Sequence, residues 1–338
     1  MVEKNMKNNY LIYLISFFSG FLSLAQEILW MRIISFAGMS VPQTFSFTLA
    51  LFLVGISIGA IIGKKICKLR ENLQLSNIGI IFFIAALVDL LLIVLVYFSF
   101  YFNGLILVLG SFVFISAMVR GIVFPMIHHV GANQVKTGAQ ISNVYFSNVF
   151  GSALAPLLIS FVALDFLNTQ QVYILICFLT LLISAICFNK KEFKFIIFLI
   201  NIFVFLCLFL PEKLFYELSK NSYELNVYPE KIIENKHGFI QVYNSHGDQV
   251  VFGANVYDGK FNTDIFHNTN GIDRAYFLTT IRPKAKDALV IGLSTGSWVK
   301  VLSMMPSLEK ITVIEINPAY HDLIKSDPAI SRILKDRR

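Results

Sequence analysis

The stretch ALVIGLSTGSW, at residues 288–298, joins a run of apolar β-forming residues to a glycine-bearing turn and a predicted helix. The segments KITVIEI at 310–316 and PAYHDLIKS at 318–326 predict a second strand and a second helix. This order of strand, loop, helix, strand and helix is typical of a doubly wound α/β unit with parallel strands. We therefore expect residues 281–338 to begin a Rossmann-like domain that is incomplete within this chain.

The glycine turn of such a unit commonly binds a ligand, because backbone N–H groups at the turn face the ligand's polar groups. An acidic residue at the end of the second strand commonly accepts hydrogen bonds from ribose hydroxyls. Glu315 follows Gly292 by 23 residues, close to the usual spacing of about 20. With Gly296, these residues predict a nucleotide-type cofactor loop. The alternative interpretation is an ordinary strand-to-helix turn with two glycines and a surface glutamate.

The composition changes along the chain. Hydrophobic residues make up 56% of the sequence and charged residues 14%, whereas an ordinary soluble domain carries about 25% charged residues. Residues 1–210 hold 12 Lys and Arg but 6 Asp and Glu, while residues 211–338 hold 16 and 15. The positive balance therefore belongs to the apolar part, where it indicates membrane topology. No basic patch with interleaved aromatic residues occurs in the C-terminal part, so no nucleic acid is expected as a partner.

The apolar part predicts a membrane-embedded α-helical bundle of about seven spans, since about 20 apolar residues cross a bilayer. The expected spans are residues 11–37, 43–63, 76–100, 103–127, 139–163, 171–188 and 195–210. The last of these has only 16 residues. The lipid bilayer is thus the first predicted partner.

The loops indicate an orientation. Lysines and arginines gather before the first span, after the second, and between the sixth and seventh. By the positive-inside rule, the N-terminus is expected in the cytoplasm, in a multi-pass protein of the inner cell membrane. Seven crossings would place residue 211 and those after it outside, and six crossings would place them inside.

Gly55, Gly59 and Gly63 repeat every four residues and so lie on one helix face. Small residues at this spacing let two membrane helices approach closely, and we expect this face to be buried against another helix. Ionisable residues inside spans are costly and suggest function, although a structural ion pair explains them equally well. They are Glu27, Asp89, Arg120 and Asp165.

The four cysteines are Cys67, Cys177, Cys187 and Cys207, and no pair has metal-ligand spacing. No metal is therefore expected. The stretch GFIQVYNSHGDQVVFGANVYDG at 238–259 alternates apolar and polar residues between turn signals, which predicts a small antiparallel β-meander. The segment GIDRAYFLTTI at 271–281 then predicts a helix.

These patterns divide the chain into three parts. They are a transmembrane helical domain at 1–210, a linker and small β-domain at 211–280, and the start of the Rossmann-like domain at 281–338.

Several segments, taken together and in order, resemble one family. They are FFSGFLSLAQEILWMRIISFAG, LALFLVGISIGAIIG, RGIVFP, VYFSNVFGSALAPLL, GFIQVY, VYDGKFN and LVIGLSTGSW followed by ITVIEINPA. The chain resembles the spermidine synthase (polyamine aminopropyltransferase) family, in its multi-pass membrane branch. This resemblance implies a methyltransferase-type Rossmann fold, decarboxylated S-adenosylmethionine as co-substrate, and aminopropyl transfer to a polyamine.

The resemblance also implies roles for individual residues. Gly292, Ser294, Gly296, Glu315 and Asn262 occupy positions that contact the co-substrate, and Asp273 and Tyr276 lie where the family contacts the amine. Four positions depart from the family pattern. Ser294 stands at the middle glycine of the loop, where a side chain can crowd the co-substrate, and Asn262 replaces a glutamine. Phe277 and Leu278 follow Tyr276 where the family has histidine and glutamate.

The family's catalytic aspartate follows the fourth strand and would fall after Arg338, so no catalytic residue is predicted. We therefore expect this chain, taken as C-terminally truncated, to be inactive alone, and an oligomer or a downstream complementing chain stays open as a partner. Two alternatives also stay open. One is a non-enzymatic membrane transport or scaffold protein with a vestigial adenosyl-cofactor module, and the other is a different transferase that uses a related cofactor.

Overall fold

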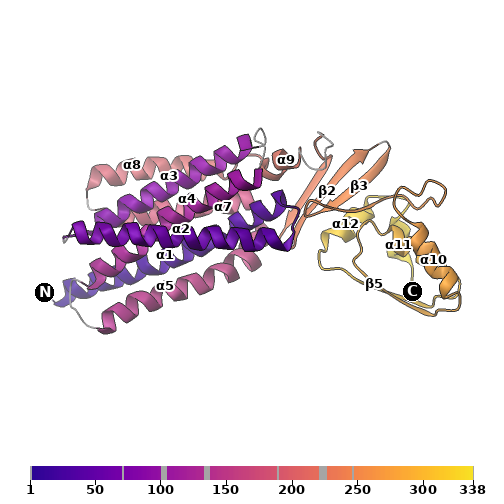
Figure 1. Ribbon diagram of the computed structural model, residues 1–338, viewed down its shortest axis with the longest axis horizontal. Helices are drawn as coiled ribbons and strands as arrows, with labels where there is room; N and C mark the ends of the chain where they lie inside the picture. The colour runs from indigo at the N-terminus through magenta and orange to yellow at the C-terminus, as the bar shows by residue number, and fades with distance from the viewer. Residues whose placement is uncertain are drawn as a thin grey trace. The chain divides into compact units, whose positions relative to one another are not determined.

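The computed structural model describes residues 2–70, 72–99, 105–132, 138–188, 190–220, 227–245 and 247–337 (Figure 1). The chain divides into two compact units, Met1–Leu214 and Phe215–Arg338. The boundary lies near the change in composition at residue 211. The small antiparallel sheet and the α/β segment both belong to the second unit, whereas the sequence analysis predicts two separate domains there.

The first unit is helical, as predicted for a membrane bundle. Its long helices are α1 (Val2–Ala37), α2 (Pro42–Leu69), α3 (Leu75–Phe98), α4 (Leu105–Ala132), α5 (Gly138–Leu158), α7 (Thr169–Cys187) and α8 (Lys191–Cys207). A π-helical turn (Ile159–Ala163) and the short α6 (Leu164–Phe166) extend α5. Within the described residues, six segments are long and apolar enough to cross a membrane: Tyr10–Ala37, Pro42–Leu69, Leu75–Phe98, Leu105–Gly131, Gly138–Phe166 and Thr169–Cys187.

The seventh predicted span differs from these six. Its apolar helical part, Phe193–Cys207, is shorter than the others. The whole of α8 has 17 residues, or about 26 Å at 1.5 Å per residue, against about 30 Å of hydrocarbon core. It packs against α7 and buries Ile197, Asn201 and Val204 on one face. In the described residues, six of the seven expected spans thus correspond to helices long enough to cross a membrane, and the seventh corresponds to a shorter apolar helix.

The glycine face of α2 packs directly against α4, as predicted. Gly55, Gly59 and Gly63 are all buried. A methyl group added at Gly59 would collide with the carbonyl oxygen of Met118 and lie 3.0 Å from the Cα atom of Gly121. The backbones of the two helices therefore approach at a distance that only glycine allows at these positions.

The second unit begins its sheet with β1 (Lys231–Asn235), which the sequence does not predict, followed by β2 (Gly238–Ser245), β3 (Asp248–Gly253) and β4 (Val256–Lys260). The four strands pair antiparallel in chain order. The short helix α9 (Leu214–Ser219) precedes them at the unit boundary. Ile240, Val242 and Val251 pack with residues of α12 (Ala319–Lys325), so the sheet and the α/β segment share a core.

The α/β segment consists of α10 (Asp273–Ile281), β5 (Asp287–Ile291), α11 (Ser297–Ser303), β6 (Lys310–Ile314), α12 and a 3₁₀ helix (Ser331–Lys335). β5 and β6 are parallel, as predicted. Leu302, Met305 and Leu308 cover one face of this two-stranded sheet. The other face exposes apolar side chains: Leu289, Ile291, Ile314 and Ile316. Two parallel strands are fewer than a Rossmann domain contains, and the segment forms a parallel βαβα unit.

Candidate functional site

The predicted glycine loop joins β5 to α11 and has the strained backbone of a tight turn. Gly292 has φ +86° and Gly296 has φ +73°, values that glycine adopts without a steric penalty. The N–H of Gly292 donates to the carbonyl of Ile314 at 2.8 Å. No heavy atom lies within 4 Å of a methyl group added at Gly292. The backbone is therefore accessible on this side of the loop.

Ser294 adopts φ +47°, which is uncommon for a residue other than glycine. Its hydroxyl donates to the backbone carbonyl of Asp258 at 2.9 Å. The hydroxyls of Thr295 and Ser297 donate to the carbonyl of Lys260 at 3.0 and 2.7 Å. Three side-chain hydroxyls thus fix the loop to β4.

A pocket of about 180 Å³ lies between this loop, β4 and β5. Its lining includes Asp258, Asn270, Ile291, Gly292, Ser294 and Trp298. Two of the predicted site residues, Gly292 and Ser294, therefore line this pocket. Gly296 is not in the lining; instead it caps α11, where an added methyl group would lie 2.9 Å from the side chains of Ile324 and Ile330.

Asp258 is a site residue that the sequence does not single out. The residue as a whole is exposed, but the atoms packed around its carboxyl group dehydrate it and raise its pKa, and the charge of Glu315 raises it further. Hydrogen bonds from the Tyr320 and Ser294 hydroxyls lower the pKa in part. In turn, burial and the charge of Asp258 raise the pKa of the Tyr320 hydroxyl well above its usual value. The DG pair at the end of β4 is the one local signal for this position.

Glu315 holds the loop from behind rather than lining the pocket. Its Oε2 accepts from the N–H of Leu293 at 2.7 Å, and its Oε1 accepts from the N–H of Asn317 at 2.7 Å. Each carboxylate oxygen keeps a second lone pair. The glutamate therefore sets the loop conformation and retains acceptor capacity.

The remaining predicted site residues lie together in a separate segment after β4. The amide of Asn262 donates to the carbonyl of His267 at 3.0 Å and to Thr269 at 2.9 Å. Asp273 accepts from the Asn268 amide at 2.6 Å. Tyr276 packs on the cluster of Ile272, Ala275 and Val301. None of Asn262, Asp273 and Tyr276 is in the pocket lining described above. The hydrogen bonds of Asn262 and Asp273 stay within this segment, whereas Tyr276 also packs against α11.

Two of the ionisable residues predicted inside spans form an ion pair in the helical unit. Arg120 Nη2 lies 2.5 Å from Asp89 Oδ2, and both side chains are buried. Ser116 donates to the other carboxylate oxygen at 2.6 Å, and the Tyr173 hydroxyl donates to the backbone carbonyl of Asp89 at 3.1 Å. Of the other two, Asp165 is exposed and Glu27 is partly buried.

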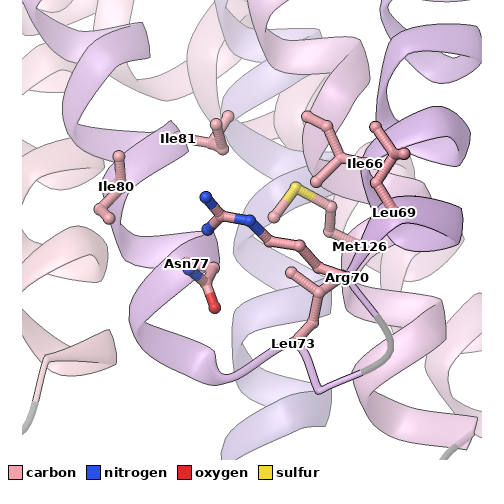
Figure 2. A pocket seen from close by; sticks show the side chains of 8 residues that line it. All are labelled: Ile66, Leu69, Arg70, Leu73, Asn77, Ile80, Ile81 and Met126. Carbon is pink, nitrogen blue, oxygen red and sulfur yellow. The ribbon is translucent and has the colours of Figure 1, made fainter.

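A further pocket of about 250 Å³ lies where α2 ends and α3 begins, beside α4 (Figure 2). Arg70 extends its guanidinium across the pocket toward α3, between Asn77 and Ile81. The other lining residues are apolar: Ile66, Leu69, Leu73, Ile80 and Met126. Among these described residues Arg70 is the one ionisable group, so this pocket lacks the paired groups that acid–base chemistry uses.

Within the described ranges, no group of three or more His, Cys, Asp and Glu side chains is arranged to hold a metal ion. No protein-family model, curated protein or solved structure matches this chain. The pocket at the glycine loop is therefore interpreted from its own geometry and charges.

Proposed function

We propose that the second unit binds decarboxylated S-adenosylmethionine in the glycine-loop pocket, as the co-substrate for aminopropyl transfer to a polyamine. The observation that carries this proposal is the pocket itself, which is lined both by the accessible backbone of Gly292 and by Asp258. The finer assignment, a methyltransferase-type Rossmann-like domain of the spermidine synthase type, belongs to the same proposal.

The charges of the pocket suit this ligand. Decarboxylated S-adenosylmethionine carries a sulfonium and a primary ammonium, so it is a dication. The carboxyl group of Glu315 lies near enough to Asp258 for its charge to raise the pKa of Asp258. Two acidic groups at one loop attract a dication and would disfavour a phosphate-bearing nucleotide.

The apolar lining suits the adenine ring. Trp298 and Ile291 are both exposed and line the pocket. Aromatic rings stack on nucleobases, so we assign adenine to the side of Trp298. The volume of about 180 Å³ holds one end of the ligand, and the remainder would extend over the open side of the pocket.

In aminopropyl transfer, the amine nitrogen attacks the propyl carbon beside the sulfonium, the carbon–sulfur bond breaks, and methylthioadenosine leaves. The attacking amine must lose its proton. The described pocket residues are assigned to binding and orientation, and we assign a catalytic base to none of them.

Tryptophan fluorescence tests the binding. The chain has two tryptophans, and in a Trp30→Phe background only Trp298 remains. Titration of this full-length variant in detergent with decarboxylated S-adenosylmethionine is expected to change Trp298 emission in a saturable way, whereas putrescine alone is not. A linear response without saturation would contradict the proposal.

One observation favours a second candidate function, that of a membrane transport protein. The Asp89 and Arg120 pair lies buried in the middle of α3 and α4. Ionisable groups at this depth are costly and commonly mark solute or proton paths. Proteoliposomes that contain the full chain should then take up radiolabelled putrescine or pyruvate faster than protein-free liposomes. Uptake of both compounds at the protein-free rate would contradict transport.

A further inference from the structure

A cavity with polar and apolar side chains in its lining lies in the helical unit, next to the buried ion pair. Its volume is about 200 Å³, and its polar lining consists of Ser19, Ser23, Arg120, Asn148 and Ser152. These residues come from α1, α4 and α5. A water molecule occupies about 30 Å³ in the liquid, so the cavity is large enough for a small organic solute.

Arg120 connects the cavity to the ion pair. Its Nη2 contacts Asp89, and the residue also lines the cavity. Arg120 is 6% exposed, and its Nε has no hydrogen-bond partner in the described part of the chain. A buried N–H donor without an acceptor is unfavourable. An acceptor group supplied by a ligand would therefore stabilise this side of the guanidinium.

The donors define the ligand. A guanidinium prefers carboxylate and other oxyanion oxygens, and serine hydroxyls and the asparagine amide can add further donors. A polyamine offers only cationic nitrogens, which Arg120 repels. We propose that this cavity binds a small oxyanion, such as a monocarboxylate, against Arg120, and that Asp89 takes up one proton from solvent on binding. The inference concerns binding alone and rests on neither proposed function.

Charge balance accounts for the proton. Asp89 and Arg120 together carry no net charge, so an added anion would leave a net negative charge in a buried environment, which is strongly disfavoured. Protonation of Asp89 restores neutrality and leaves the guanidinium to the ligand. The groups that face Asp89 are Arg120 and Ser116 on α4 and Tyr173 and Cys177 on α7. Arg120 is the one cation among them.

Calorimetry on the full chain in detergent tests the inference, with acetate and pyruvate as probes and putrescine as the cationic control. Titrations in two buffers of different ionisation enthalpy count the protons taken up. We expect pyruvate or acetate to bind with uptake of about one proton, so that affinity falls by at most about tenfold per pH unit as the pH rises. Absence of binding by both anions, or binding without proton uptake, would overturn the inference.

Two variants test the roles of Asp89 and Arg120 separately. Asp89→Asn removes the proton acceptor and should bind the anion with an affinity that no longer depends on pH. The double variant Asp89→Asn, Arg120→Gln leaves no buried charge unpaired and should lose binding at least tenfold while keeping its gel-filtration profile. Binding by this double variant with the affinity of the unmodified chain would contradict the role of Arg120.

The cavity itself is tested without disturbing the ion pair. Ser23→Val replaces a hydroxyl in the lining by two methyl groups and should weaken anion binding. Ser57→Val makes the same change at an exposed position on α2 and should not. Equal affinities of these two variants would show that the anion binds elsewhere. This pair keeps the inference testable if the double variant fails to fold.

Discussion

The hydroxyl of Ser294 donates to the backbone carbonyl of Asp258 at 2.9 Å, across 36 positions of sequence. This bond joins the glycine loop to the end of β4 and closes one side of the pocket. Ser294 forms this bond with a left-handed backbone conformation, φ +47°. The serine therefore has a structural use that glycine could not provide, although its side chain lines the pocket.

Ser294→Ala should loosen the loop. The alanine keeps the unfavourable backbone conformation and loses the hydrogen bond, which contributes about 1 kcal/mol, equivalent to roughly fivefold in a local opening equilibrium. Hydrogen exchange by mass spectrometry on the full chain should therefore be faster for residues 292–297. Ser294→Gly relieves the backbone strain while losing the same bond and should show a smaller change. Equal protection of this loop in Ser294→Ala and the unmodified chain would refute a positioning role.

Asp258 should make the stability of the second unit depend on pH. Its pKa is raised in the folded unit, so the folded state binds this proton more tightly than the unfolded state. The stabilisation is complete at pH values below the ordinary aspartate pKa and is lost as the pH rises through the raised pKa. Asp258→Asn stays neutral and should not show this loss.

The test compares thermal unfolding of both chains in the Trp30→Phe background, followed by Trp298 fluorescence. We take the difference in unfolding midpoint as the value for Asp258→Asn minus the value for the chain that keeps Asp258. This difference is expected to increase as the pH rises from 4 to 7. A difference that stays constant or decreases over this range would contradict the assigned shift.

Much of the fold follows from the sequence because hydrophobic period and length report on local structure. The span expected at 171–188 corresponds to Thr169–Cys187, and the strand within 288–291 corresponds to β5, Asp287–Ile291. The sequence does not predict strand β1, because its residues KIIEN mix charged and apolar side chains. Most of these residues are only partly buried. The two parallel strands predicted for the start of the Rossmann-like domain correspond to β5 and β6, which pair in the described residues.

The candidate site is less predictable because it depends on contacts between distant segments. Gly292 and Ser294 are found from the loop motif, but Asp258 reaches the pocket only because the loop packs on β4. Likewise, spacing cannot reveal that Asp89 and Arg120 face each other, since pairing depends on the rotation of two helices about their axes. The resemblance leads us to expect Asn262 at the co-substrate, whereas its side-chain amide donates to His267 and Thr269 within its own segment.

Gly59→Ala should destabilise the helical unit. The added methyl group would collide with the Met118 carbonyl on α4, and overpacking of this kind costs about 1–3 kcal/mol. The apparent melting temperature of the full chain in detergent should fall. Gly138→Ala is the matched control because no heavy atom lies within 4 Å of its added methyl group. Similar melting temperatures for these two variants would contradict close packing of α2 and α4.

Membrane topology separates the two proposed functions. Because decarboxylated S-adenosylmethionine is a cytosolic metabolite, the proposal requires the second unit to face the cytoplasm. Six crossing helices with a cytoplasmic N-terminus would give this orientation, with α8 not crossing. Fluorescent and phosphatase reporters fused after Lys220 should therefore report a cytoplasmic position. An external position would show that α8 crosses as a seventh helix and would leave the transport function as the remaining candidate.

Binding of decarboxylated S-adenosylmethionine to the full chain in detergent, measured by isothermal titration calorimetry, tests the proposed function most directly. The proposal predicts saturable binding at one site per chain. Glu315→Ala leaves the N–H groups of Leu293 and Asn317 without their acceptor, at about 1–3 kcal/mol for each buried group, and should weaken binding by about tenfold or more. Glu309→Ala, at an exposed residue paired with Lys286, should bind like the unmodified chain. Absence of binding to the unmodified chain, or equal binding by Glu315→Ala, would contradict the proposal.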